Sequence, residues 1–269
     1  MLPMTRALKR FLIKESIRKI NSEGNPFYSE VLLGKEESHH LKNVLRVNQS
    51  EKCLILDPKG NEFIGEVQSF RDDGQCEIRV LEKTSGSSPL AFKLTVAQAI
   101  PQNRKMDIIV EKAAELGVNA LIPLITERTI VRLPKEKTEK VVERWQRIAN
   151  QTVKQSRQRI IPEICDITNF RALWTDEKRF GEVIVLHPEP ASVLLCESLF
   201  SSLRSDKELK KKFLFVIGPE GGFSGREIEF AKSKRTKIAS LGEGLLKTDT
   251  AFVVAVGLFK LWSFQTNDG

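Results

Sequence analysis

Phe213-Leu214-Phe215-Val216-Ile217, followed at once by Gly218-Pro219-Glu220-Gly221-Gly222, decides the fold class of this chain. Five consecutive apolar residues are typical of a strand that is buried on both faces of a parallel sheet. The glycines that follow allow a backbone to approach a bound molecule closely, and loops at the carboxyl ends of such strands bind ligands. Ser224 and Glu227 then have the spacing of a capping box. The stretch therefore predicts a strand, a ligand-binding loop and a helix.

Two further apolar strands end in a similar way. Residues 183–186 stop at His187-Pro188, and residues 237–241 stop at Gly242-Glu243-Gly244. Because the carboxyl ends of parallel strands meet at one edge of a sheet, the three loops together favour one shared pocket. Each loop taken alone is better explained as an ordinary connection between a strand and a helix, which every α/β domain contains, and only the three together favour the pocket.

The chain changes character at residues 84–89, a polar run that ends in proline and has the composition of a linker. Before it, short alternating runs predict the hairpins of a small β-barrel, at residues 53–56, 63–67 and 76–80. After it, strands predicted at residues 92–99 and 120–125 alternate with helices predicted at 106–116 and 135–155. We therefore expect an α/β protein with a β-barrel domain over residues 1–85 and a mainly parallel sheet, covered by helices on both faces, over residues 90–269.

The last predicted helix, about residues 248–264, is apolar nearly all round between residues 251 and 259. A helix without a polar face is expected to be buried. It is either the central core helix or part of a subunit interface, and we expect it to serve as both.

Composition excludes several classes of protein. The four cysteines, at positions 53, 76, 165 and 196, have no paired spacing, and with only three histidines a zinc site is not expected. The first 20 residues are too charged for a signal peptide, and the longest apolar stretch, residues 251–258, is too short to span a membrane. We expect a cytoplasmic protein that binds no metal and no membrane.

The formal net charge is +8, and most of the excess lies in residues 126–159, with 10 basic and 4 acidic side chains. A concentrated basic stretch indicates a polyanionic partner such as RNA. Ion pairs along a solvated helix explain the first half of the stretch equally well. They do not explain Lys154, Arg157 and Arg159, which have no acidic neighbour in the sequence before Glu163.

Assembled in order, these residues resemble the 16S ribosomal RNA uracil-N3 methyltransferases of the SPOUT superfamily. The resemblance covers nearly the whole chain and rests on the following stretches: residues 39–46, 112–118, Pro123, 126–128, 144–148, 154–156, 161–164 and 217–223.

The resemblance implies an N-terminal PUA-like β-barrel that binds RNA, joined to a SPOUT-type α/β domain with a trefoil knot over about residues 183–251. It implies a homodimer that methylates N3 of a uridine in 16S ribosomal RNA, with the RNA or the small ribosomal subunit as its partner. The cofactor of the family, S-adenosylmethionine, lies between three knot loops. These loops correspond to the three strand ends described above.

Site residues follow from the same resemblance. The expected cofactor contacts are Leu186, His187, Ile217, Gly218, Glu220, Gly222, Leu241, Gly242, Leu246 and Thr248. The expected RNA contacts are Arg10, Arg46, Arg128, Lys154, Gln155, Arg157 and Arg159.

The third knot loop, residues 241–250, departs from the family pattern. Gly244 and Lys247 replace two arginines, and Asp249 replaces a glutamate; Gln102 and Gln158 also stand where a lysine and an arginine are usual. Because methylation of uracil N3 requires loss of the imide proton, we assign Lys247 to stabilise the developing uracil anion. Asp249 or Glu220 would accept the proton. The alternatives are a helix-start acid for Asp249 and a carboxylate that holds loop amides for Glu220.

Two other functions remain open at this point. One is a non-catalytic RNA-binding protein that retains the fold after its third loop has changed. The other is a phosphate or nucleotide binder that uses residues 218–222, which we favour least because no Walker lysine follows the glycines.

Overall fold

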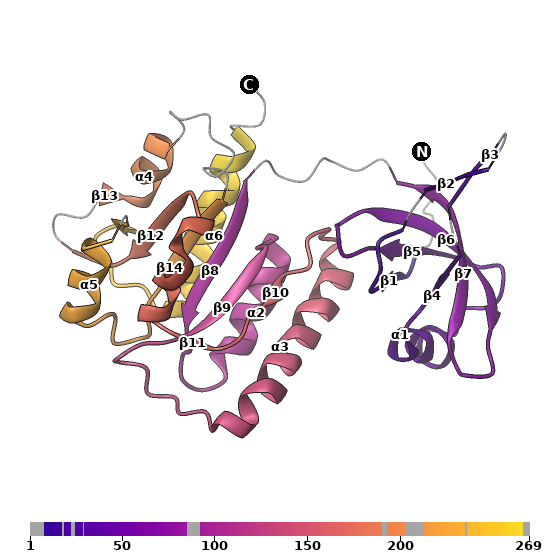
Figure 1. The fold of residues 1–269 in the computed structure, drawn as a ribbon, viewed down its shortest axis with the longest axis horizontal. Helices are drawn as coiled ribbons and strands as arrows, with labels where there is room; N and C mark the ends of the chain where they lie inside the picture. The colour runs from indigo at the N-terminus through magenta and orange to yellow at the C-terminus, as the bar shows by residue number, and fades with distance from the viewer. Residues whose placement is uncertain are drawn as a thin grey trace. The chain divides into compact units, whose positions relative to one another are not determined.

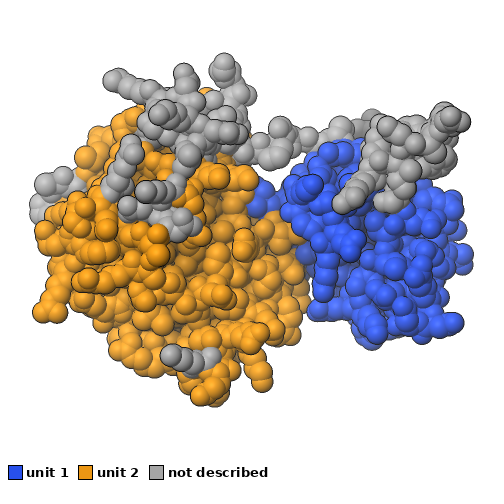
Figure 2. All heavy atoms as spheres, viewed as in Figure 1, with its two compact units in different colours: residues 1–89, 153–160 blue, residues 90–152, 161–269 orange. Residues whose placement is uncertain are grey.

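The computed structural model describes residues 8–17, 19–22, 25–28, 30–84, 92–189, 193–202, 212–234 and 236–265. The chain divides into two compact units (Figure 2): unit 1 contains residues 1–89 and 153–160, and unit 2 contains residues 90–152 and 161–269. The predicted linker residues 85–89 lie outside the described residues. Unit 1 therefore includes a segment, residues 153–160, that is distant in sequence from the rest of that unit.

Unit 1 is built on a curled five-stranded sheet (Figure 1) with the order β1-β5-β6-β7-β4. The predicted hairpins are confirmed, because β5 pairs with β6 and β6 with β7 in antiparallel fashion. Alternate residues of β6 and β7 are buried, as expected for strands with one face on a core. The strands are β1 (Arg10–Leu12), β4 (Glu30–Leu32), β5 (Lys52–Leu56), β6 (Glu62–Phe70) and β7 (Cys76–Lys83).

The described part of unit 1 also contains four shorter elements that the sequence patterns did not predict. Strands β2 (Lys19–Ser22) and β3 (Asn25–Tyr28) form a separate hairpin. Helix α1 (Lys35–His39) continues into η1 (His40–Val44), a turn of π-helix.

Unit 2 contains an eight-stranded sheet in which every pair of neighbours is parallel, which confirms the mainly parallel sheet. Its main order is β10-β9-β8-β14-β12-β15-β13, and β11 also pairs with β9. The strands are β8 (Lys93–Ala99), β9 (Ala120–Ile125), β10 (Glu163–Ile164), β11 (Thr168–Asn169), β12 (Glu182–Leu186), β13 (Val193–Leu194), β14 (Lys212–Ile217) and β15 (Lys237–Ser240).

Helices cover both faces of this sheet, as predicted. On one face, Leu214 and Val216 of β14 share a core with Trp174 and Ile228. On the other face, Phe213 and Phe215 make edge-to-face ring contacts with Phe259. Both faces are therefore buried, which explains why β14 is apolar at nearly every position. The helices are α2 (Lys105–Leu116), α3 (Lys135–Ser156), η2 (Arg171–Arg179), α4 (Leu195–Ser202), α5 (Gly225–Lys232) and α6 (Thr248–Gln265).

Helix α6 is buried on one side, as expected of a core helix, and exposed on another. Phe252 and Phe259 are buried, but Leu261 is 66% exposed and Phe264 is 50% exposed. One side of this apolar helix packs on the sheet. The other side forms an apolar surface on the single chain. Among the described residues, no helix is long and apolar enough to cross a membrane.

Candidate functional site

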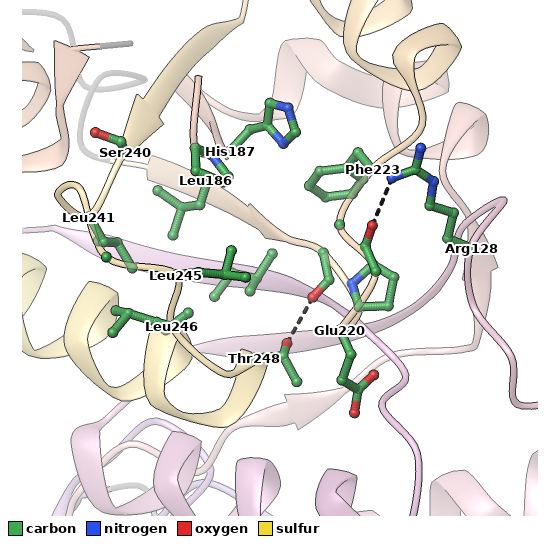
Figure 3. A pocket seen from close by; sticks show the side chains of 18 of the residues that line it. Arg128, Leu186, His187, Glu220, Phe223, Ser240, Leu241, Leu245, Leu246 and Thr248 are labelled. Atoms are coloured by element: carbon green, nitrogen blue, oxygen red, sulfur yellow. Dashed lines mark hydrogen bonds between the residues drawn. The ribbon is translucent and has the colours of Figure 1, made fainter. Parts of the chain in front are cut away.

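A cavity of about 260 Å³ lies in unit 2, beyond the carboxyl ends of β12, β14 and β15 (Figure 3). All ten residues predicted as cofactor contacts line it. Its other lining residues are Arg128, Pro188, Pro219, Gly221, Phe223, Ser240, Gly244, Leu245 and Ala251. Parallel strands therefore bring together three loops that are separated by up to about sixty residues in the chain.

The cavity has an apolar side. Leu241, Leu245 and Leu246 of the third loop gather there with Leu186 from the end of β12 (Figure 3). Leu245 is 84% exposed. An exposed leucine beside a pocket is available to pack against an apolar or aromatic part of a ligand.

A buried hydrogen-bond chain joins the second and third loops. Thr248, the first residue of α6, donates its hydroxyl to the carbonyl oxygen of Gly218 at 2.8 Å. The same hydroxyl accepts a hydrogen bond from Nε2 of Gln98 at 2.9 Å. Gln98 lies on β8, is fully buried, and also donates to the carbonyl oxygen of Ala99. The core of the sheet therefore fixes the distance between two walls of the cavity.

The glycine-rich loop is held from outside as well. Arg128 donates to the carbonyl oxygen of Gly221 at 2.8 Å. Within the loop, Gly222 has a φ of +66°, and a β-carbon placed there would meet no atom within 4 Å. Glycine is required here for its backbone conformation rather than for lack of space.

The helix that follows this loop begins as the sequence predicts. Ser224 accepts a hydrogen bond from the amide of Glu227, and the Glu227 carboxylate accepts one from the amide of Ser224. Its other oxygen accepts from the amide of Glu127 at 2.9 Å. The capping box is therefore confirmed, and Glu227 also ties α5 to the loop that contains Arg128.

His187 contributes a half-buried imidazole to the cavity. Burial lowers its pKa, and the neighbouring cations Lys232 and Arg128 lower it further against an opposing effect of Glu189. The ring is therefore neutral at neutral pH. Its Nδ1 is buried and has no hydrogen-bond partner in the described part of the chain. A ligand in the cavity can supply that partner.

The three predicted catalytic residues are placed differently. Glu220 lines the cavity. Lys247 is exposed, and neither it nor Asp249 is among the lining residues. Asp249 is nevertheless connected to Glu220, because Nζ of Lys105 lies 3.7 Å from Oε1 of Glu220 and 4.0 Å from Oδ1 of Asp249.

Most of the predicted RNA contacts belong to unit 1. Arg46, Gln155 and Arg157 are exposed there, and Arg46 and Arg157 have positive φ angles of 51° and 59°. Arg128, in unit 2, is also exposed despite its bond to Gly221. The basic stretch is thus divided between the two units, with residues 126–152 in unit 2 and residues 153–159 in unit 1.

Arg10 requires a correction, because it is 7% exposed and faces inward. It forms an ion pair with Glu62 at 2.6 Å and donates to the carbonyl oxygen of Val153 at 3.1 Å. Burial lowers the pKa of its guanidinium, against the opposing effect of Glu62. Arg10 therefore holds residues 153–160 to the sheet of unit 1 and is not available as a surface contact.

The expectation that Lys154 and Arg159 have no acidic partner is also corrected. Lys154 pairs with Glu37 at 2.7 Å, and Arg159 pairs with Glu62 at 3.3 Å. These acids are about 100 residues away in sequence, so a search of neighbouring residues could not find them. Within the described residues, Arg157 forms no ion pair.

Sequence reasoning missed Gln98, Lys105 and the loop contact of Arg128. Gln98 gave a usable signal, since it is a polar residue inside the apolar strand of residues 94–100. Lys105 gave none, because its two partners come from loops more than 100 residues further along. No group of residues in the described chain has the composition of a metal site.

Comparison with known proteins agrees with this arrangement. Residues 88–260 match the family model described as an RNA methyltransferase domain, and residues 33–81 match that of an RNA methyltransferase PUA domain. The ribosomal RNA small subunit methyltransferase E of Bacillus subtilis is 30% identical over 259 residues, which cover 96% of this chain and 97% of that protein. Its Aquifex aeolicus counterpart is 29% identical over 241 residues, covering 86% and 97%.

A solved structure has the same fold. The crystal structure of a ribosomal RNA small subunit methyltransferase E from Neisseria gonorrhoeae, bound to S-adenosyl methionine, has a TM-score of 0.77 and 26% identity. The match covers 94% of this chain and 97% of that one. The predicted PUA domain at the N-terminus and the predicted methyltransferase class are confirmed. With one family model spanning most of unit 2 and a relative matching over nearly its full length, this chain belongs to the RNA methyltransferase family of the ribosomal RNA small subunit methyltransferases E.

Proposed function

We propose that this enzyme transfers the methyl group of S-adenosylmethionine to N3 of a uridine in 16S ribosomal RNA. The observation that carries the proposal is the cavity that all ten predicted cofactor contacts line. The small ribosomal subunit or its RNA supplies the substrate, and the reaction takes place in the cytoplasm.

The chemistry of the cavity suits this cofactor. Leucines of the third loop offer an apolar surface to the adenine ring. The glycine-rich loop exposes backbone groups to polar edges, and the neutral imidazole of His187 has a ring nitrogen available to a ligand. S-adenosylmethionine carries a sulfonium cation, and Glu220 in the wall of the cavity provides a negative charge near it.

Methyl transfer to N3 demands positioning and removal of one proton. Alignment of two bound reactants supplies on the order of 7–11 kcal/mol of the barrier. A carboxylate that accepts the imide proton adds a further contribution. Asp249 and Glu220 serve this step, and Lys247 of the exposed third loop approaches the base when RNA is bound.

Unit 1 is the main RNA-binding domain in this proposal. Arg46, Gln155 and Arg157 are exposed on it, and guanidinium groups suit phosphate oxygens. Arg128 adds a contact next to the cavity, where the target base must reach the cofactor. Residues 1–85 form the RNA-binding domain and residues 90–269 the catalytic domain. Residues 153–160 are fixed to the first domain, because Arg10 donates to Val153 and Glu62 pairs with Arg159.

We also propose a homodimer and a knotted C-terminal segment over about residues 183–251. The apolar side of α6 supports the dimer, since Val253, Leu261 and Phe264 are 40%, 66% and 50% exposed. Exposed apolar surface of this kind marks interfaces. The knot follows from the family resemblance, and the three strands of that segment, β12, β14 and β15, are neighbours in the sheet.

The decisive test uses small ribosomal subunits from a strain that lacks the gene. Purified enzyme and S-adenosylmethionine are added, and the nucleosides of the digested 16S ribosomal RNA are analysed by mass spectrometry. The expected result is one new 3-methyluridine per subunit. A methyl group on a different atom of uridine, or on another base, would contradict the N3 assignment, and no methylation would contradict the proposed activity.

A further inference from the structure

Lys105 lies between two carboxylates at the edge of the cavity. It is on the first turn of α2, and its Nζ is 3.7 Å from Glu220 and 4.0 Å from Asp249. Its side chain is 28% exposed, and those of the two acids are 33% and 32% exposed. The lysine therefore connects the glycine-rich loop after β14 with the start of α6.

The backbone before Lys105 is strained. Asn103 and Arg104 have φ angles of +55° and +57°, a conformation that residues other than glycine rarely adopt. Arg104 is the N-cap residue of α2 and makes no side-chain capping bond. Two successive strained residues that contribute no cap to the helix are typical of a segment held in place for function.

This strained turn contacts the cavity loop at a second point. The amide of Gln102 donates to Oε1 of Glu220 at 3.3 Å. Glu220 is thus held both by a backbone amide and by Lys105. Asp249 is not held in this way, because its buried Oδ1 has no hydrogen-bond partner among the described residues and has only the ion pair with Lys105.

We propose that Lys105 is a positioning residue for methyl transfer, holding the Asp249 carboxylate in place as the acceptor of the uracil N3 proton. Two carboxylates that approach the same point repel each other, and the ammonium group between them offsets that repulsion. Glu220 is the second anchor of the lysine. The inference rests on the proposed function and adds a residue to it.

The N3–H bond breaks, and its proton passes to a carboxylate oxygen of Asp249. The N3 electron pair forms the new N–C bond with the methyl group, while the methyl–sulfur bond breaks and leaves its electron pair on sulfur. The products are 3-methyluridine, neutral S-adenosylhomocysteine and a protonated Asp249, which later releases its proton to water.

The test measures single-turnover methylation with enzyme in excess over small subunits. We expect Lys105→Met to slow the reaction on the order of 10²-fold, the lower end of the usual contribution of proton transfer. The affinity for S-adenosylmethionine, measured by calorimetry, should stay within about threefold because Lys105 does not line the cavity. Lys105→Arg keeps the cation and should recover most of the rate.

The matched control is Lys112→Met. Lys112 lies on the same helix α2 and pairs with Glu115 at 2.7 Å, and it does not line the cavity either. This variant makes the same chemical change in a similar ion pair. It should retain nearly the full rate if the effect of Lys105 is specific to its position.

A double-mutant cycle with Asp249→Asn separates positioning from general structural damage. If Lys105 acts through Asp249, the variant Lys105→Met with Asp249→Asn will be no slower than the slower single variant. Three results would each overturn the inference. In the first, the rate losses of the two single variants multiply in the double variant. In the second, Lys105→Met stays within about threefold of the wild-type rate, and in the third it loses as much affinity for S-adenosylmethionine as it loses rate. Lys105→Gln repeats the test with a polar side chain if the methionine variant is poorly folded. A wild-type enzyme that forms no 3-methyluridine would overturn the proposed function, and this inference with it.

Discussion

Thr248→Val tests whether the hydrogen-bond chain beneath the cavity controls cofactor binding. Valine has almost the same shape as threonine but replaces the hydroxyl by a methyl group. The substitution therefore removes the bond to the carbonyl oxygen of Gly218 at 2.8 Å and the bond from Gln98 at 2.9 Å, with no cavity left behind. Thr248 is 4% exposed, so water cannot simply replace the hydroxyl.

The expected loss of stability follows from these two bonds. Each contributes about 1 kcal/mol net, so removing both costs about 2 kcal/mol. Gln98 keeps its bond to the carbonyl oxygen of Ala99, and Gly218 is partly exposed, so neither group is left wholly unsatisfied. In a unit of this size, a loss of about 2 kcal/mol lowers the Tm by about 4–8 °C.

The effect on the cofactor should exceed what the loss of stability alone would produce. Freed from Thr248, the carbonyl of Gly218 no longer has a fixed direction, and the second and third loops can move apart. We expect the Kd for S-adenosylmethionine to rise about tenfold, which corresponds to about 1.4 kcal/mol. Calorimetric titration measures the Kd, and differential scanning calorimetry measures the Tm.

Thr248→Ser is the matched control. It keeps the hydroxyl and removes one methyl group, so it should cost about 0.8 kcal/mol of stability and leave the Kd nearly unchanged. Valine binding the cofactor as tightly as wild type would refute the reasoning. Serine weakening binding as much as valine would refute it too, because the hydroxyl would then not be the cause.

Three further variants test other parts of the site. Gly222→Val should weaken cofactor binding more than about tenfold because φ is +66° there, whereas Gly221→Ala should be tolerated because its β-carbon would meet Arg128 at an ordinary 3.7 Å; equal effects on Kd would contradict this. Arg157→Glu should leave the cofactor Kd unchanged and reduce the log–log salt slope of RNA binding by about 0.7 for each phosphate that is no longer neutralised; an unchanged slope would remove Arg157 from the RNA surface. Lys247→Ala should slow single-turnover methylation by about 10²–10³ with both ligands still bound; a rate within about threefold of wild type would make Lys247 a surface charge.

The cavity was predictable because its signals are local. Each strand end shows an apolar run that stops at glycine or proline, and parallel pairing then places the three ends at one edge. The same reasoning identified the capping box at Ser224, since both partners lie within four residues. Short-range patterns of this kind are predictable because the residues that form them lie next to one another in the sequence.

The pairing of charged side chains was the least predictable property, because the two partners of an ion pair can be far apart in the sequence. Arg159 has no acidic neighbour in the sequence, yet Glu62 pairs with it across 97 residues. Arg10 was expected at the RNA and is buried against the same glutamate. Composition gives the excess of basic residues correctly. It does not show which of these residues form ion pairs with acidic side chains in the folded chain.

The same limit explains why Lys105 was missed and why it is informative. Its partners, Glu220 and Asp249, were both predicted as proton acceptors from their own loops, with no indication that one cation contacts both. Only the fold brings the start of α2 to these loops, and it does so through a strained turn that local preferences disfavour. Strained backbone beside a ligand cavity is a sign of function, because such strain clusters at functional sites, where the surrounding structure holds it in place. For this enzyme, residues such as Lys105, whose role no sequence pattern predicts, are therefore the most informative ones to mutate.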